Sequence, residues 1–353
     1  MGKMLKSFVA VVLALIMVVA LCTGLTGCND GRTKLYVYNW GEYIDEDVLE
    51  LFEQEYPQYR VIYDTFATNE EMYQKVASGS VAYDVLIPSD YMIERMIKED
   101  FLVEIDTASM ENYSKINPSL LGTAFDPEEK YSVPYMWGTL GIIYNTTMVE
   151  EEVDSWSILW NKKYDKQILM LESVRDTLGF TLKMLGYSLN TTSEKEIMEA
   201  RDKLIEGKPL YANWGVDTLK DPIKNGQYAM AVTWSGDAME IMSENEDIAY
   251  VVPKEGSNYW IDSMVIPKCS KNQEGAKLFI DFMCRTDIAL MNAEEIGYST
   301  PQMEVLEQLG EEYINDEVYN PPEEIVNNCE VFVDLGEHLM TYNAAWEKVR
   351  LFS

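Results

Sequence analysis

Residues 34–39 read Lys-Leu-Tyr-Val-Tyr-Asn and run directly into Trp40-Gly-Glu42-Tyr43. This stretch alternates and is rich in tyrosine and valine, which predicts a β-strand. After the loop at Trp40, Asp45 can cap a helix whose apolar residues recur at helical spacing until Pro57. The folded part of the chain is therefore expected to open with a strand, a loop and a helix.

The same alternation of strand and helix continues along the chain. Residues 59–63 and 84–87 are expected to be strands, and each precedes a segment with helical spacing of apolar residues. Thr68 and Glu71 form a capping box at the start of the second helix. Three strand–helix pairs in succession predict a parallel α/β layer.

The remainder of the chain predicts a second layer. Residues 135–145 are apolar and are either a strand that crosses to a second lobe or simply a core strand, and residues 260–267 are expected to cross back. A chain of 353 residues exceeds one typical core, so two lobes with a hinged cleft are expected. The other expected elements are strands at 166–171, 229–234 and 248–252, helices at 176–185, 193–206 and 273–284, and a mostly helical end at 323–349.

The first 27 residues are expected to be an export signal and not part of the fold. Lys3 and Lys6 precede a nearly apolar run that is too short for a confident membrane span. The run ends in Leu25-Thr-Gly-Cys28, which is similar to a lipobox, so Cys28 would be diacylated and residues 28–33 would be a lipid-anchored linker. The alternatives are an ordinary signal or an uncleaved anchor. The domain should lie outside the cytoplasm, tethered to the membrane.

The composition excludes several classes of function. Lys and Arg number 28 against 60 Asp and Glu, a net charge of -32, so nucleic-acid binding is not expected. The acidic surface favours solubility and can also draw cations toward a cleft. A single histidine, His338, and no Cys-x-x-Cys spacing give no support for a metal site or a disulfide framework, although one pair among Cys269, Cys284 and Cys329 stays open.

Several aromatic and acidic residues fall where an α/β sheet binds ligands. Trp40 and Tyr43 follow the first expected strand, and Ser89 and Tyr91 follow the third, so they should meet at one rim. Further along, Trp260-Ile-Asp-Ser263 again sets an indole beside an acid. Carboxylates pair with ammonium groups, and aromatic rings cover methylenes and attract cations. These residues predict a trap for an organic cation.

Five motifs follow one another along the chain: Tyr38–Tyr43, Asp84–Ser89, Leu185–Ser188, Trp260–Ser263 and Ile296–Pro301. In the order and spacing of these motifs the chain resembles the extracytoplasmic spermidine/putrescine-binding proteins of ABC importers. The resemblance implies an α/β, two-lobed periplasmic-binding-protein fold (type II), in which each lobe has a mostly parallel sheet flanked by helices and several crossings form the hinge. The lobes would be 34–140 with 262–306, and 141–261 with 307–353.

The resemblance also implies residue roles. Asp176 lies where the family has a glutamate, Ser173 replaces a second aspartate that neighbouring Glu172 could compensate for, and the family's glutamine is missing near Phe332. Because these departures fall on groups that recognise one end of the ligand, the choice between spermidine and putrescine stays open. The expected ligand contacts are Trp40, Tyr43, Ser89, Tyr91, Asp176, Trp234, Trp260, Asp262 and Tyr298, with Glu42 and Ser173 as further candidates.

Each candidate also has an ordinary structural explanation. Trp40 could be core packing, Ser89 could cap a helix, Asp176 could pair with Arg175, and Asp262 could be a hinge carboxylate. The expected partners are a polyamine, a membrane permease with its cytoplasmic ATPase, and the membrane through Cys28, for a monomer that needs no cofactor.

Three other functions compete with the transport hypothesis. An enzyme could use Asp176 and Asp262 as paired acids, but the sequence has no nucleotide or flavin glycine loop and one histidine. The same fold could present its ligand to a sensor kinase. It could also import another cation or an amino sugar.

Overall fold

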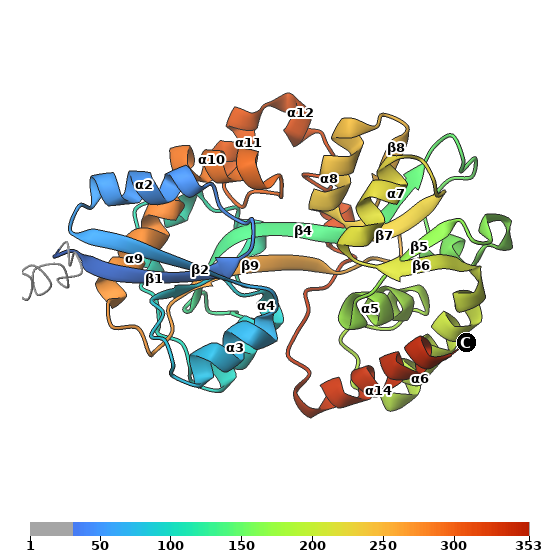
Figure 1. The fold of residues 1–353 in the computed structure, drawn as a ribbon, viewed down its shortest axis with the longest axis horizontal. Coiled ribbons are helices and arrows are strands. Elements are labelled where there is room, and N and C mark those ends of the chain that lie inside the picture. The colour runs from blue at the N-terminus through green and yellow to red at the C-terminus, as the bar shows by residue number, and fades with distance from the viewer. Residues whose placement is uncertain (1–30, 353) are drawn as a thin grey trace, which may run out of the picture.

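The computed structural model describes residues 31–352, which fold into two lobes joined by long strands (Figure 1). The expected export signal and the expected lipid site Cys28 lie outside these residues. Within 31–352, no helix has both the length and the apolar character that crossing a membrane requires.

The first lobe contains the three predicted strand–helix pairs. Its strands run parallel, with β1 between β2 and β3. Helix α2 covers one face of this sheet, and α3 and α4 cover the other (Figure 1). The elements are β1 (Thr33–Trp40), α2 (Glu46–Glu55), β2 (Tyr59–Phe66), α3 (Asn69–Ala77), β3 (Val85–Leu86) and α4 (Asp90–Lys98).

Both predicted helix starts in this lobe are confirmed. The Asp45 carboxylate caps α2 by accepting a hydrogen bond from the Asp47 N–H at 2.9 Å. The Thr68 hydroxyl caps α3 by accepting from the Glu71 N–H at 3.1 Å, and the Glu71 carboxylate reaches back to the Ala67 N–H at 3.2 Å. These bonds satisfy N–H groups that a helix leaves unpaired in its first turn.

The second lobe has the same construction. Strand β5 lies between β6 and β7, and all three are parallel. Helices α5, α6 and α14 cover one face, while α7 and α8 cover the other (Figure 1). The elements are β5 (Ile168–Leu171), α5 (Val174–Met184), α6 (Glu194–Gly207), β6 (Tyr211–Gly215), α7 (Lys220–Lys224), β7 (Met230–Trp234), α8 (Ser235–Glu244), β8 (Ile248–Val251) and α14 (Leu339–Leu351).

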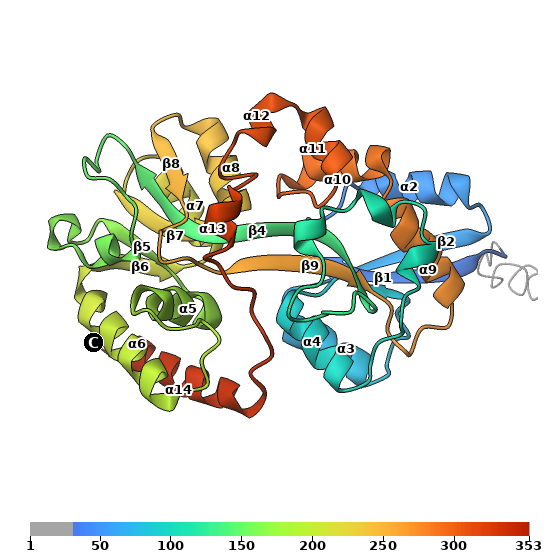
Figure 2. The same ribbon diagram turned by 180° about the vertical axis from the view of Figure 1, so that it is seen from behind.

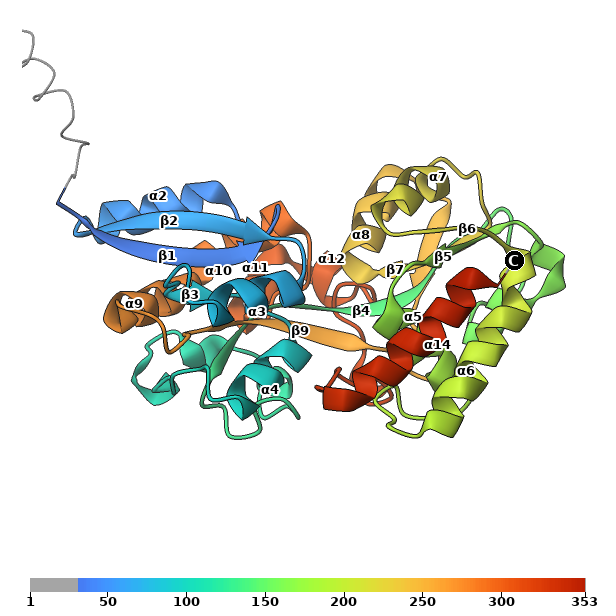
Figure 3. The ribbon, with the colours of Figure 1, turned by 60° about the horizontal axis from the view of Figure 1, so that its bottom comes forward.

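Two long antiparallel strands connect the lobes, as Figure 3 shows from below. The first part of β4 (Ser132–Asn145) pairs with β9 (Tyr259–Val265), and its last part pairs with β7 and β8. Strand β9 also pairs with β3 in the first lobe. The result is one continuous sheet in the order β2-β1-β3-β9-β4-β7-β5-β6. Residues 135–145 are therefore the crossing strand.

A third connection runs beside these strands after α13 (Glu323–Val326), and Figure 2 shows it leading from the hinge to α14. The Glu330 N–H donates to the Ser257 carbonyl at 2.9 Å, and the Tyr259 N–H donates to the Glu330 carbonyl at 3.2 Å. The chain thus passes between the lobes three times, as a multi-crossing hinge requires.

The remaining helices cover the first lobe and the upper side of the hinge: α9 (Gln273–Met283), α10 (Thr286–Ile296), α11 (Met303–Leu309) and α12 (Glu311–Ile314). Helix α9 packs its buried face on α2, where Phe279 and Phe282 lie 5.1 and 5.3 Å from the Phe52 ring centroid. Cys269, Cys284 and Cys329 are all free thiols, so the pairing that the sequence left open does not form.

Candidate binding cleft between the lobes

A cleft of about 1630 Å³ separates the two lobes. All the candidate residues from the sequence line it, although they come from segments far apart in the chain. They are Trp40, Glu42, Tyr43, Ser89 and Tyr91 from the first lobe, Trp260 and Asp262 from the crossing strand β9, Ser173, Asp176 and Trp234 from the second lobe, and Tyr298 after α10.

The ends of parallel strands bring these residues together. Trp40 is the last residue of β1, and Ser89 lies between β3 and α4. In the other lobe, Trp234 is the last residue of β7, and Asp176 is in the first turn of α5 after β5. The carboxyl edges of both sheets therefore face the same space, as expected for ligand sites in open α/β sheets.

Asp262 is a buried carboxylate with one unused oxygen. Its Oδ2 accepts a hydrogen bond from the Tyr43 hydroxyl at 3.0 Å, whereas its Oδ1 has no partner in the part of the chain that the structure describes. Burial raises the pKa of Asp262 to about 6, and hydrogen bonding with Ser89 and Tyr43 limits the rise. A buried charged oxygen without a partner is costly, so this position favours a cation or a proton.

Ser89 occupies the N-cap position of α4, but its side chain makes no cap hydrogen bond. Its backbone is bridged to Asp262. Next to it, the Tyr91 hydroxyl donates to Glu70 at 3.1 Å at the rim of the cleft. The hydroxyl of Ser89 is therefore available to the carboxylate and the cleft.

Aromatic rings form a continuous wall around Asp262. Trp260 and Tyr298 meet edge to face with centroids 5.1 Å apart, and Tyr43 lies 5.9 Å from Tyr298. Two glycines make this packing possible, because a Cβ at Gly138 would lie 2.6 Å from the Trp260 ring and one at Gly236 would lie 2.0 Å from Tyr298. The close approach of backbone to ring fixes where the wall stands.

The loop that carries the first contacts is bent at Glu42. This residue has φ 51°, in the left-handed region that side chains other than glycine disfavour. Its side chain is exposed at the rim, while the next residue, Tyr43, turns inward and is buried. Strained backbone of this kind is retained where the surrounding structure needs the turn.

Asp176 is the second buried carboxylate of the cleft. The Ser173 hydroxyl donates to its Oδ2 at 2.6 Å, and the Asn258 amide donates to its Oδ1 at 3.3 Å. Burial raises the pKa of Asp176, and these hydrogen bonds oppose the rise. Ser173 thus orients Asp176. Glu172 does not replace the missing acid, because it is exposed and pairs with Arg350 at 3.3 Å.

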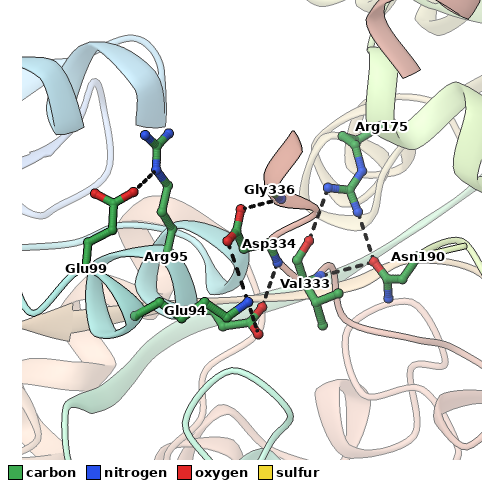
Figure 4. A network of polar contacts seen from close by, with 9 residues as sticks. Glu94, Arg95, Glu99, Arg175, Asn190, Val333, Asp334 and Gly336 are labelled. Carbon is green, nitrogen blue, oxygen red and sulfur yellow. Dashed lines mark hydrogen bonds and ion pairs between the residues drawn. The ribbon is translucent and has the colours of Figure 1, made fainter. Parts of the chain in front are cut away.

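Arg175 is not the partner that the sequence left open for Asp176. Its guanidinium donates to Asn190 at 2.9 Å and to the Val333 carbonyl at 3.3 Å (Figure 4). It also lies 4.3 Å from the centroid of the Phe332 ring. Phe332 itself lines the cleft. One end of the cleft is therefore apolar and cationic.

The same segment touches the first lobe. The Asp334 N–H donates to the Glu94 carboxylate on α4 at 2.6 Å (Figure 4). Lys98 pairs with Glu94 at 2.7 Å and approaches Asp334 at 3.5 Å. The third connection thus links α4 to the residues that hold Arg175.

Among the charged cleft residues that the sequence reasoning missed are Asp90, Lys220 and Asp237. Asp90 is buried behind Ser89, with an Oδ2 that lacks a partner within 31–352, and burial raises its pKa well above the usual value. Lys220 and Asp237 line the opposite wall. Asp237 follows the end of β7 by three positions, so the rule that found Trp40 and Ser89 could have found it.

No group of His, Cys, Asp and Glu among the described residues has the arrangement of a metal site. The chemistry of the cleft is carried by carboxylates and aromatic rings. This combination suits an organic cation. The carboxylates pair with its charged groups, while the rings attract the charge and cover the carbon chain.

The fold and the cleft define a class: a type II, two-lobed solute-binding protein. The family model for "Bacterial extracellular solute-binding protein" matches residues 47–321, and the chain belongs to this family. The resemblance found in the sequence motifs is confirmed, as is the expected fold.

Individual relatives are similar over nearly the whole chain. The spermidine/putrescine-binding periplasmic protein of Escherichia coli (strain K12) is 36% identical over 334 residues, covering 94% of this chain and 96% of its own. The solved substrate-binding protein of a spermidine/putrescine ABC transporter from Streptococcus pneumoniae is 41% identical, with a TM-score of 0.83 over 91% of this chain and 99% of that chain. A lipoprotein of Treponema pallidum is 27% identical, with a TM-score of 0.81 over 90% and 99%.

Proposed function

We propose that the protein is the substrate-binding component of an ABC importer, which captures spermidine, putrescine or both in the cleft and delivers them to a membrane permease. One observation carries this proposal: the buried Asp262 keeps Oδ1 unpaired inside an aromatic cleft. A ligand ammonium would supply the missing partner. The relatives that bind spermidine and putrescine, similar over nearly the whole chain, support the same ligand class.

The acids, serines and aromatic rings that line the cleft have different roles in recognising the ligand. Asp262 and Asp176 accept ammonium hydrogen bonds, and Ser89 and Ser173 orient these acids. The rings cover the methylene chain and attract its charges. The proposed ligand contacts are Trp40, Glu42, Tyr43, Ser89, Tyr91, Ser173, Asp176, Trp234, Trp260, Asp262 and Tyr298.

Closure of the lobes completes the site. We propose that the lobes divide near residues 140 and 262, where β4 and β9 carry the chain across. The third division follows α13, later than the residue 306 expected from the sequence, which falls inside α11. Closure excludes water, which strengthens each carboxylate–ammonium contact. The permease then distinguishes the closed, loaded form from the empty one.

The location that we propose for the protein rests on the expected lipid site at Cys28. Lipid on Cys28 would hold a monomer at the outer face of the cytoplasmic membrane, or in the periplasm, next to the permease and its cytoplasmic ATPase. Binding alone is the task, with no turnover and no cofactor. Mass spectrometry of polyamine incubated with the purified protein tests this, and a converted product would favour an enzyme.

The ligand class is tested by the rise in melting temperature of the purified protein, since a ligand that binds only the folded state stabilises it. Putrescine and spermidine should each raise the melting temperature, and glucosamine and lysine should not. Calorimetric titration then gives the affinities. A rise with glucosamine and none with either polyamine would overturn the proposal.

A further inference from the structure

A lysine of the protein itself occupies part of the cleft wall. Lys220, the first residue of α7, places its Nζ 2.5 Å from the Asp237 carboxylate and 3.4 Å from the Glu240 carboxylate. Both acids are on α8, and all three residues line the cleft. One lysine therefore neutralises part of the acidic wall from within.

Asp237 is the member of this group that lies deepest. Its side chain is 12% exposed, and its Oδ2 accepts a hydrogen bond from the Thr233 hydroxyl at 3.3 Å. Burial raises the pKa of Asp237, and the ammonium of Lys220 opposes the rise. Without Lys220, a largely buried carboxylate would face the cleft with no counter-charge, which is costly unless a cation replaces it.

This carboxylate lines the same cleft as Asp176 and Asp262. Gly236 packs against the Tyr298 ring so closely that a Cβ would lie 2.0 Å from it, and Asp237 is the next residue. Tyr298 interacts electrostatically with Asp237 and with Asp262. Both carboxylates are therefore near enough to the Tyr298 hydroxyl to add to the rise of its pKa that burial causes.

The end of a lysine side chain is chemically the end of an aliphatic polyamine: a primary ammonium on a chain of methylenes. We propose that Lys220 is a specificity-determining residue, which occupies the place of a third ligand ammonium at Asp237 and so lowers the affinity for triamines relative to diamines. This inference rests on the proposed function. With Lys220 in place, Asp176 and Asp262 remain for the two ammonium groups of a diamine.

The test compares Lys220→Met with Lys224→Met by titration calorimetry with putrescine and spermidine. Lys224 is a matched control, because it pairs with Glu244 at 3.2 Å in the same α7–α8 contact but does not line the cleft. Lys220→Met should bind spermidine about tenfold more tightly, as one added charge pair in a partly buried site allows. Its affinity for putrescine should change by less than about twofold, and Lys224→Met should leave both affinities unchanged.

Two further variants keep the inference falsifiable. Lys220→Arg retains the charge and should retain the wild-type ratio of affinities. Lys220→Met with Asp237→Asn should lose the gain for spermidine, because that gain requires the Asp237 charge. Melting curves without ligand establish that each variant is folded.

The outcomes separate this inference from the proposed function. If the wild-type protein binds neither amine, the proposed function fails and this inference with it. If it binds both amines, only the inference is at stake. It is overturned when Lys220→Met changes both affinities equally, or when the gain for spermidine persists in the double variant.

Discussion

Replacing Asp262 by asparagine keeps the shape of the side chain but removes its negative charge. The amide oxygen can still accept the Tyr43 hydroxyl, which lies 3.0 Å from Oδ2. The amide NH2 then takes the place of Oδ1, the oxygen that has no partner within residues 31–352. The substitution therefore removes both the charge and the acceptor that the proposed function assigns to a ligand ammonium.

The expected loss of affinity follows from burial. Asp262 is 7% exposed, so its contact with an ammonium would be a buried charge pair. Removing one partner of such a pair costs about 2 to 5 kcal/mol. This is a rise in the dissociation constant of about 30-fold to about 5,000-fold.

The empty protein should respond in the opposite direction. The pKa of the Asp262 carboxyl is raised from 3.8 to about 6 in the folded state, so folding loses stability as the pH rises through this range. Each unit corresponds to about 1.4 kcal/mol, so above pH 6 the buried charge destabilises the empty protein by about 3 kcal/mol. Asn avoids this penalty, and the empty variant should melt at a higher temperature than the wild type.

Titration calorimetry with putrescine measures the first effect, and thermal unfolding without ligand at pH 7.5 measures the second. Asp217→Asn is the control, because Asp217 lines the same cleft but is exposed. An exposed charge contributes at most about 1 kcal/mol, so its affinity should fall by no more than about fivefold. If the Asp262 variant binds putrescine within about threefold of wild type, Asp262 does not hold a ligand ammonium.

Three other changes test the same cleft. Lowering the pH from 7 to 5 should weaken putrescine binding about tenfold, because a ligand ammonium pairs with the ionised Asp262, whose pKa is about 6. Calorimetric titration at several pH values measures this. A putrescine affinity of the wild-type protein that does not change between pH 7 and 5 would be incompatible with it. Trp260→Ala should cost about 1 to 3 kcal/mol of binding free energy from lost ring contact with methylenes and charge, and an unchanged dissociation constant would exclude Trp260 from the site. Gly236→Ala should weaken binding and lower the free energy of unfolding by about 1 to 3 kcal/mol, because its Cβ would lie 2.0 Å from the Tyr298 ring. Gly41→Ala is the control, because a Cβ there has open space and should change neither quantity. Equal behaviour of the two alanine variants in melting and titration would refute this.

Local sequence signals predicted much of the first lobe. Asp45 and the pair Thr68 and Glu71 satisfy their own helix starts, so the information lies within a few residues of the chain. The alternation in residues 34–39 likewise marks strand β1, in which Leu35 and Val37 are buried and Tyr36 between them is half-buried. Where the contacts that determine an element are local, the sequence alone was sufficient to predict that element.

The elements that the sequence did not predict depend on distant partners. Helix α8 begins at Ser235 without a side-chain cap and contains Gly236 in its first turn, a poor start by local propensity. Its position is set instead by the Tyr298 ring, which comes from beyond β9 and needs the space that glycine leaves. Strand β6 was missed because its five residues include Asn213 and Gly215, which are depleted in strands.

The candidate residues of the cleft could be predicted because strand ends have a common position in α/β sheets. This rule and the family motifs together assigned Trp40, Ser89 and Trp234 to one binding site from the sequence alone. It could not reveal Lys220, because that side chain reaches the cleft from a helix whose packing on α8 is visible only in three dimensions.

Within residues 31–352, two buried carboxylates of the cleft lack a partner that a ligand cation would supply. Asp262 and Asp90 each bury an oxygen without a partner among the described residues, and Glu42 holds a strained backbone at the rim. A sequence selected for stability alone would remove such features, since buried charge and strain both weaken the folded state. Two of the three unpaired buried carboxylate oxygens in the described part of the chain lie in this cleft, so the empty cleft costs stability. Binding of a cation recovers part of this stability, and it recovers most in the closed form, which links occupancy of the cleft to the position of the lobes.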